Sequence, residues 1–382
     1  MKRFVIAAAF ACVSAVLFGI EANVELESNF LYTTYIKNET FSALTQTVSV
    51  DSLNAYQLIG LKLRENINKV RLVFDARFFY FPASNELRYE IDNAYFQVPR
   101  GASVLYAGKQ RIRWGTGYAW NPSDKLQQQT LVIDTIREAP GIYGVRFDRS
   151  GGFLSSSFIV SPSPAGYAGD WGENFTLAAQ LYKLIGTADV FVNSIYRHNS
   201  LQTIGAALSW DTGLFVLNFE GAAIRYMERE LNLLRYTGRK STRDVEYDFT
   251  AGINRTLGDN GMLVLEYYRH NWGIGNDGFA DAAAGYEDDP ALLNFLRMGA
   301  KKDYAALSLS WNHKEAWAFN ASAIFGLNDG SIIAYPSLSY VENNNWDFTA
   351  GYIHNFSERR NPEGYYALPF YNTVEMKIRA YF

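Results

Sequence analysis

Apolar and polar residues alternate along this chain, and this repeated period of two constrains its fold more than any other feature. The final segment places Val374, Met376, Ile378, Ala380 and Phe382 on one face and Glu375, Lys377, Arg379 and Tyr381 on the other. Successive side chains of a strand point to opposite faces, so one face suits an apolar surrounding and the other suits water. The same alternation runs through 59–64, 70–80, 245–254, 307–312 and 346–352, as is typical of half-buried strands.

Repetition of this pattern predicts an all-β chain. We predict about 18 strands, or 16 if one hairpin is lost, near 24–36, 54–65, 69–80, 88–98, 102–113, 141–149, 152–161, 173–184, 187–197, 201–210, 213–225, 244–255, 261–271, 304–313, 315–326, 330–341, 345–355 and 371–382. The weakest of these predictions flank the short links 198–200 and 327–329.

The links between these strands sort by length. Every second link is short and turn-like, at 66–68, 99–101, 150–151, 186, 211–212, 257–260, 314 and 343–344. The alternate links are mostly long, at 37–53, 81–87, 114–140, 162–172, 226–243, 272–303 and 356–370. Short periplasmic turns opposite long extracellular loops are typical of transmembrane barrels. The sequence therefore predicts a transmembrane antiparallel up-and-down β-barrel with both termini on the short-turn side.

The N-terminus has the form of an export signal. Lys2 and Arg3 precede an apolar run from Phe4 to Ile20, which reads as a signal peptide cleaved near Ala22. The run is also long enough for a spanning helix, which is the alternative. We therefore expect a signal peptide over 1–22 and a barrel domain over 23–382. Cys12 is the single cysteine and lies in the signal, so the mature chain has no disulfide framework.

Composition agrees with a barrel without deciding for one. Aromatic residues make up 16% of the chain, which suits the aromatic girdles of membrane barrels. The mean hydropathy of −0.15 is too low for a bundle of membrane helices, whereas half of each barrel strand faces water. Composition by itself does not separate a barrel from a soluble β-sandwich.

The face predicted to line the lumen is rich in charge. Its candidate pore-lining residues are Lys62, Arg64, Arg71, Asp75, Arg77, Glu90, Asp92, Lys109, Arg111, Arg113, Arg146 and Asp148. These side chains have two possible roles. They either pair with one another and stiffen the wall, or form basic and acidic ladders that set the selectivity of the pore for the charge of a solute. Three cations of equal parity, Lys109, Arg111 and Arg113, predict a local positive stripe.

The most distinctive segment, 108–124, leaves a predicted strand and is dense in glycine and aromatic residues. The candidate constriction residues in it are Trp114, Tyr118, Trp120, Asn121 and Asp124. The link 114–140 is long enough to fold inward and narrow a pore. An exposed surface loop is the alternative.

The segment Gly-Lys-Gln-Arg-Ile-Arg-Trp-Gly at 108–115, followed by Asn121 and later by Asp134, resembles alginate-export-type porins and their porin-like relatives. The closing strand that ends on Phe382 resembles the signal read by the barrel-assembly machinery of Gram-negative bacteria. The resemblance implies an outer-membrane location and a conduit with basic residues on its wall. The many carboxylates predicted here do not suit a conduit for uronate polymers.

The sequence thus predicts an outer-membrane porin that gives small polar or charged solutes passive passage through a water-filled lumen. The alternative is a non-transport barrel that binds surface partners or acts as a scaffold. Expected partners are outer-membrane lipid, lipopolysaccharide, the assembly machinery and small polar solutes, with a homo-oligomer left open and nucleic acid excluded.

No enzyme, cofactor or metal is expected. The histidines, His198, His270, His313 and His354, fall in no motif that pairs one of them with a nucleophile. The acidic loop 272–303 carries carboxylates that suit hard cations, but it lacks the spacing of a twelve-residue calcium loop.

Overall fold

The computed structural model describes residues 21–35, 52–126, 141–162, 175–198, 200–227, 245–271, 302–314, 316–328, 330–342, 345–355 and 371–381. The first strands are β1 Glu21–Tyr35, β2 Ser52–Ile67, β3 Val70–Phe81, β4 Glu86–Arg100, β5 Ser103–Gln110, β6 Ile142–Arg149, β7 Ser155–Pro162, β8 Phe175–Ile185 and β9 Ala188–Arg197. They are followed by β10 Leu201–Asp211, β11 Val216–Tyr226, β12 Val245–Leu257, β13 Gly261–His270, β14 Asp303–His313, β15 Trp317–Gly326, β16 Ser331–Glu342, β17 Trp346–Asn355 and β18 Tyr371–Tyr381. No helix among these residues has the length and apolar character of a membrane span.

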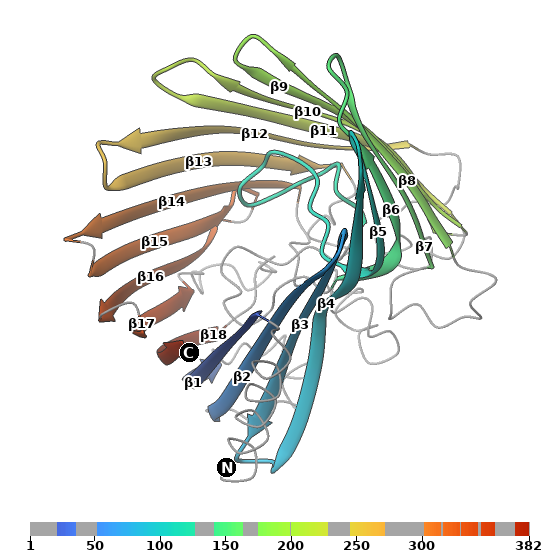
Figure 1. Cartoon of the computed structure of the whole chain (residues 1–382). Helices are drawn as coiled ribbons and strands as arrows, with labels where there is room; N and C mark the ends of the chain where they lie inside the picture. Colours follow the sequence, from blue (N-terminus) through green and yellow to red (C-terminus); the bar gives the residue numbers. More distant parts are fainter. Residues whose placement is uncertain are drawn as a thin grey trace.

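The described strands form one closed antiparallel barrel of 18 strands, which confirms the larger predicted number (Figure 1). Each strand pairs with its neighbours in sequence. The barrel closes because β1 pairs with both β2 and β18, in a register that sets Glu27 opposite Leu58 and Arg379. A closed sheet leaves no unpaired strand edge, which is the condition for spanning a lipid bilayer with strands.

The short turns lie where the sequence places them, at one end of the barrel. Residues with positive φ occupy them: Asn68, Gly101, Gly186, Gly213, Gly258 and Lys314. Three links at the opposite end, 82–85, 198–200 and 327–330, are short as well. The last two were predicted to be short, whereas the first had been counted with the long links as 81–87. The alternation of link lengths thus reports the up-and-down order of the strands.

The outward face of the barrel is apolar and carries aromatic side chains at both ends. Tryptophans mark the short-turn end, at Trp210, Trp311, Trp317 and Trp346, with exposed fractions of 42–47%. Tyrosines mark the long-loop end, at Tyr32, Tyr89, Tyr143, Tyr247 and Tyr352, and they too are exposed. The inward face carries most of the charged residues, including Glu375, Lys377 and Arg379 of β18.

Candidate functional site: the lumen and its inward-folded loop

The chain that follows β5 turns into the barrel, so the segment 111–126 lies within the ring of strands (Figure 1). Strand geometry ends at Gln110. Gly108 allows a close approach of strands there: its φ is +128°, and a Cβ would lie 2.2 Å from the carbonyl oxygen of Ala94. We call 111–126 the lumenal loop. Of the two courses left open for 114–140, residues 114–126 take the inward one, and 127–140 lie outside the described residues.

One buried carboxylate on β13 holds the tip of the lumenal loop. Glu266 accepts three backbone hydrogen bonds, from the N–H groups of Tyr118 at 2.6 Å, Ala119 at 3.1 Å and Trp120 at 2.8 Å. Glu266 is only 2% exposed. A buried carboxylate requires donors in place of water, and charge-assisted hydrogen bonds are the stronger kind. The loop backbone therefore supplies the hydrogen-bond donors that the buried carboxylate needs, and the carboxylate supplies the acceptors that the loop N–H groups need.

A second buried carboxylate, Glu220 on β11, holds the two flanks of the loop. It accepts from the N–H of Thr116 at 2.8 Å and from the N–H and Oγ of Ser123 at 2.8 and 2.7 Å. Gly115 has a φ of +96°, and a Cβ there would lie 2.5 Å from Glu220 Oε2. Glycine at this position therefore lets the backbone reach the carboxylate.

Side chains of the loop complete the attachment. Asp124 accepts from the N–H groups of Trp114 at 2.9 Å and Leu126 at 3.2 Å, which folds the loop on itself. Lys125 pairs with the buried Asp248 of β12 at 3.2 Å. Arg197 of β9 donates to the carbonyl oxygen of Lys125 at 2.6 Å. The loop is thus tied to β9, β11, β12 and β13.

Asp124 lies outside the spanning strands, and its burial raises its pKa from 3.8 to about 6, against the opposing effect of its two backbone hydrogen bonds. A raised pKa means that the docked state binds the proton more readily than an open loop would. The contribution of this carboxyl to docking is therefore full in acid and is lost as the pH rises through about 6.

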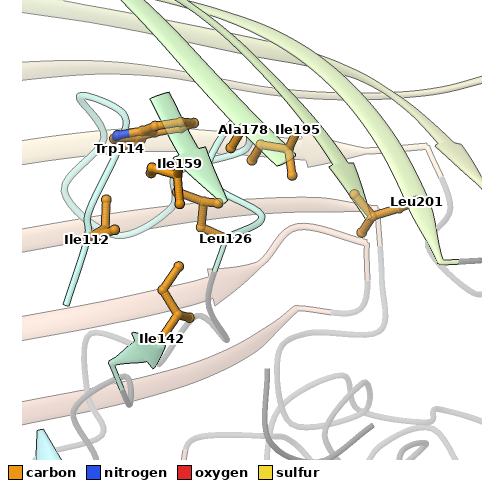
Figure 2. Close-up of a cluster of buried hydrophobic side chains, with 8 residues drawn as sticks. All are labelled: Ile112, Trp114, Leu126, Ile142, Ile159, Ala178, Ile195 and Leu201. Atoms are coloured by element: carbon orange, nitrogen blue, oxygen red, sulfur yellow. The ribbon is translucent and has the colours of Figure 1, made fainter. Parts of the chain in front are cut away.

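Apolar packing anchors both ends of the loop. Figure 2 shows one cluster, in which Ile112, Trp114 and Leu126 of the loop lie with side chains of the surrounding wall: Ile142, Ile159, Ala178, Ile195 and Leu201. At the tip, Trp120 stacks on Tyr268 of β13, with ring centroids 5.2 Å apart. Both tryptophans of the loop are 5% exposed, so they fix the loop rather than line a passage.

The predicted constriction residues therefore divide into two groups. Trp114, Trp120, Asn121 and Asp124 are buried against the wall. Tyr118 is 36% exposed, with its hydroxyl 3.3 Å from Ser308 Oγ of β14. Arg113 is exposed beside it and donates to the carbonyl oxygens of Gly117 and Tyr118, at 3.2 and 3.4 Å. Arg113 and Tyr118 are thus the most exposed residues of the loop.

The docking of the loop leads to a test at Gly205 of β10. A Cβ on Gly205 would lie 2.3 Å from Ser123 Cβ, so leucine there forces the loop away, at a cost of roughly 1–3 kcal/mol for overpacking. We expect Gly205→Leu to increase trypsin cleavage after Lys125 in the folded, detergent-solubilised protein. Gly221→Leu on β11 is the matched control, because a Cβ there meets nothing closer than 3.8 Å. Equal cleavage in the two variants would contradict the docking contact.

Most predicted lumenal charges meet on one wall, formed by β1–β4 and β18. Arg64 pairs with Asp75 at 2.6 Å, and Arg77 pairs with Glu90 at 2.9 Å. Asp92 joins two cations, Arg77 at 2.8 Å and Arg111 at 2.6 Å. Lys62 lies on the same face of the sheet, and Arg71 lies on that face at the short-turn end of the barrel. We call this the charged wall.

Arg146 and Asp148 form a separate inward pair on β6, at 3.2 Å. The Arg146 guanidinium lies 3.9 Å from the ring centroid of Tyr106. These residues face the lumen as predicted but belong to another part of its surface.

The predicted stripe of three cations is wrong at Lys109. The Lys109 ammonium lies 5.3 Å from the ring centroid of Tyr143, its cross-strand neighbour on the outward face. Alternation holds only within a strand, and β5 ends at Gln110. The chain then turns, so Arg111 points inward to Asp92 while Lys109 points outward.

Sequence reasoning missed the carboxylates that hold the loop: Glu220, Asp248 and Glu266. Glu220 and Glu266 bind mainly backbone N–H groups, and Asp248 pairs with the side chain of Lys125. These partners lie about 100 residues or more away in sequence, which no local pattern reports. One signal was present, because β11–β13 place several carboxylates on inward positions with few cations. It also missed Glu25 and Glu27 of β1, which belong to the charged wall.

Some predictions concern segments outside the described residues: 1–20 of the predicted signal with Cys12, Asp134, most of the acidic loop 272–303, and Phe382. The last two residues of the predicted signal, Glu21 and Ala22, are described and begin β1. Of the histidines, His198 stacks on Phe175 and His354 on Tyr352. Within the described residues, no group of three or more His, Cys, Asp or Glu side chains is arranged to hold a metal ion.

Comparison with known proteins rests on structure alone, because no protein-family model and no curated protein sequence matches the chain. Among similar solved structures are OccK5 (OpdH) of Pseudomonas aeruginosa (TM-score 0.60, 12% identity) and OccAB4 of Acinetobacter baumannii (TM-score 0.58, 9% identity). OccK2 (OpdF) of P. aeruginosa, solved in complex with glucuronate, has a TM-score of 0.58 at 10% identity. Each match covers 95% of this chain and 98% of the other.

The chain has the fold of these proteins. They are outer-membrane porins of the Occ/Opd group with 18-stranded barrels. The comparisons support a porin-like barrel and do not support the narrower resemblance to alginate-export-type porins.

Proposed function

We propose that this protein is an outer-membrane porin that lets small polar or charged solutes diffuse through its lumen. The observation that carries the proposal is the lumenal loop itself. It is tied by buried carboxylates to the inner wall, and its exposed side chains are Arg113 and Tyr118. A loop fixed inside a closed barrel narrows the lumen without requiring any catalytic group.

The outward face supports a membrane location. Exposed apolar side chains occupy the band between the tryptophans of the short-turn end and the tyrosines of the long-loop end. Aromatic girdles at both interfaces flank the apolar band of outer-membrane barrels, because amphipathic rings suit the headgroup level. We accordingly propose export through the signal over 1–22, assembly of 23–382 by the barrel-assembly machinery, and contact with lipid and lipopolysaccharide.

The charges on the lumenal surface support polar solutes as the cargo. Cations and carboxylates alternate on the charged wall, and such a surface can replace part of the hydration of a polar solute. The structural neighbour OccK2 was solved with a small polar acid, glucuronate, which fits this class. We propose roles in lining the passage for Lys62, Arg64, Arg71, Asp75, Arg77, Glu90, Asp92, Arg111, Arg113, Arg146 and Asp148.

Solute entry into liposomes tests the proposal. We expect vesicles that contain the folded protein to swell in isosmotic solutions of small sugars, at rates that fall steeply as the sugar grows. Heat-unfolded protein is the control. Folded protein that leaves the vesicles as tight as empty ones would overturn the porin and favour the scaffold alternative.

A further inference from the structure

A cavity of about 250 Å³ opens in the charged wall, lined mainly by β1–β3 and also by residues of β4, β18 and the lumenal loop. Its lining includes Glu25, Gly60, Lys62, Arg77 and Arg111. A cavity of this volume suits a small organic solute rather than a single ion.

A glycine creates this cavity. Gly60 lies between Glu25 of β1 and Arg77 of β3 in the register of the sheet, so the three residues share one row of the inward face. The carboxylate and the guanidinium flank a position that has no side chain. A Cβ on Gly60 would already lie 3.3 Å from Glu25 Cβ, so a larger residue would fill the niche.

The charges around the niche differ in how firmly they are held. The carboxylate oxygens of Asp92 lie within 3 Å of the guanidinium groups of both Arg77 and Arg111, so these three side chains form tight ion pairs. The pair Lys62–Glu25 is looser, with 3.7 Å between Nζ and Oε2. The Lys62 side chain is 54% exposed and the Glu25 side chain 21%, and Arg379 of β18 also interacts electrostatically with Glu25. The loosely held groups at the niche are therefore one ammonium and one carboxylate.

We propose that this niche binds a small zwitterion, such as an α-amino acid, by exchange of ion-pair partners. The inference rests on the proposed porin function and names the solute class of its lumen. The ammonium of the solute pairs with Glu25, and its carboxylate pairs with Lys62. One weak exposed pair is given up, and two pairs form in its place.

The same geometry disfavours solutes that carry a single charge. An anion that pairs with Lys62 takes away the cation paired with Glu25, leaves Glu25 only the electrostatic influence of Arg379 on β18, and brings a second negative charge close to it. A cation that pairs with Glu25 takes away the partner of Lys62 and brings a second positive charge close to it. A solute with both charges provides a partner for each of the two residues, so the niche selects by the arrangement of charge rather than by its net sign.

Block of single-channel current measures occupancy of the niche directly. The probes are L-asparagine, L-aspartate and L-2,4-diaminobutyrate, which have similar size and differ in net charge. In potassium chloride, asparagine should block at the lowest concentration. Glu25→Gln and Lys62→Gln should each raise its half-blocking concentration about five-fold, the equivalent of a weak ion pair. Gly60→Leu should abolish the block.

Control variants are available on β4, where Glu86 and Arg88 form an exposed pair outside the niche. Glu86→Gln and Arg88→Gln should leave the block by asparagine unchanged. Conducting channels that the three probes block equally, or a block that survives Glu25→Gln and Lys62→Gln, would overturn the niche and leave the porin intact. Folded protein without any current would overturn the porin, and the niche with it.

Discussion

Replacing both Glu220 and Glu266 with alanine is expected to raise the single-channel conductance of the barrel. Together these carboxylates accept six hydrogen bonds from the lumenal loop, five of them from backbone N–H groups. Hydrogen bonds to charged groups contribute roughly 1.5–3 kcal/mol each, so the double variant loses several kcal/mol of docking energy. Once the loop is released, the lumen is wider on time average, and the current through each open channel increases.

The barrel itself should survive these substitutions, because its strands pair through backbone hydrogen bonds that neither side chain makes. Folding is checked by the heat-dependent shift in electrophoretic mobility that folded barrels show. Glu86→Ala on β4 is the matched control, since it removes an exposed carboxylate that has no contact with the loop. Unchanged conductance in a folded double variant would mean that these carboxylates do not hold a constriction.

Charge reversal at Arg113 is expected to shift ion selectivity toward cations, whereas the same change at Lys109 should leave it unaltered. Arg113 is exposed on the lumenal loop and bonds only to loop carbonyl oxygens among the described residues, so its charge is not neutralised there. Lys109 lies two residues before the loop begins and points outward, against Tyr143. The two sites carry the same charge and lie close in sequence, yet they face opposite sides of the wall.

The reversal potential in a salt gradient measures this difference. Arg113→Glu should move the potential toward the value for a cation-selective pore, because charges that line a narrow passage act on permeating ions at short range. Lys109→Glu should give the wild-type value. If Lys109→Glu moved the potential as far as Arg113→Glu, the outward placement of Lys109 would be wrong. If neither variant moved it, Arg113 would not line the passage.

The number of strands and their order in the barrel were predictable because both depend only on residues that lie close together in the sequence. Alternation along 70–80 or 374–381 needs only neighbouring residues, and link length needs only the next turn. Their agreement favoured 18 strands with 16 left open, and the structure has 18. The inward face of Lys62, Asp75 and Arg77 followed from the same counting.

The attachment of the loop was not predictable in this way. Trp114 and Trp120 looked like residues of a constriction because they are aromatic and close to glycines, but they pack against wall residues far away in sequence. Glu220 and Glu266 bind backbone groups, and any residue type can supply those. Lys109 was misplaced because parity was counted through the end of a strand, where the alternation stops.

Recording from planar bilayers tests the central claim most directly. Purified, folded protein at low concentration should insert as single units and give discrete, stable steps of ion current. The account predicts such steps for the wild-type chain, larger steps when Glu220 and Glu266 are both alanine, and none for the heat-unfolded protein. A folded barrel that enters the bilayer and stays silent would contradict it.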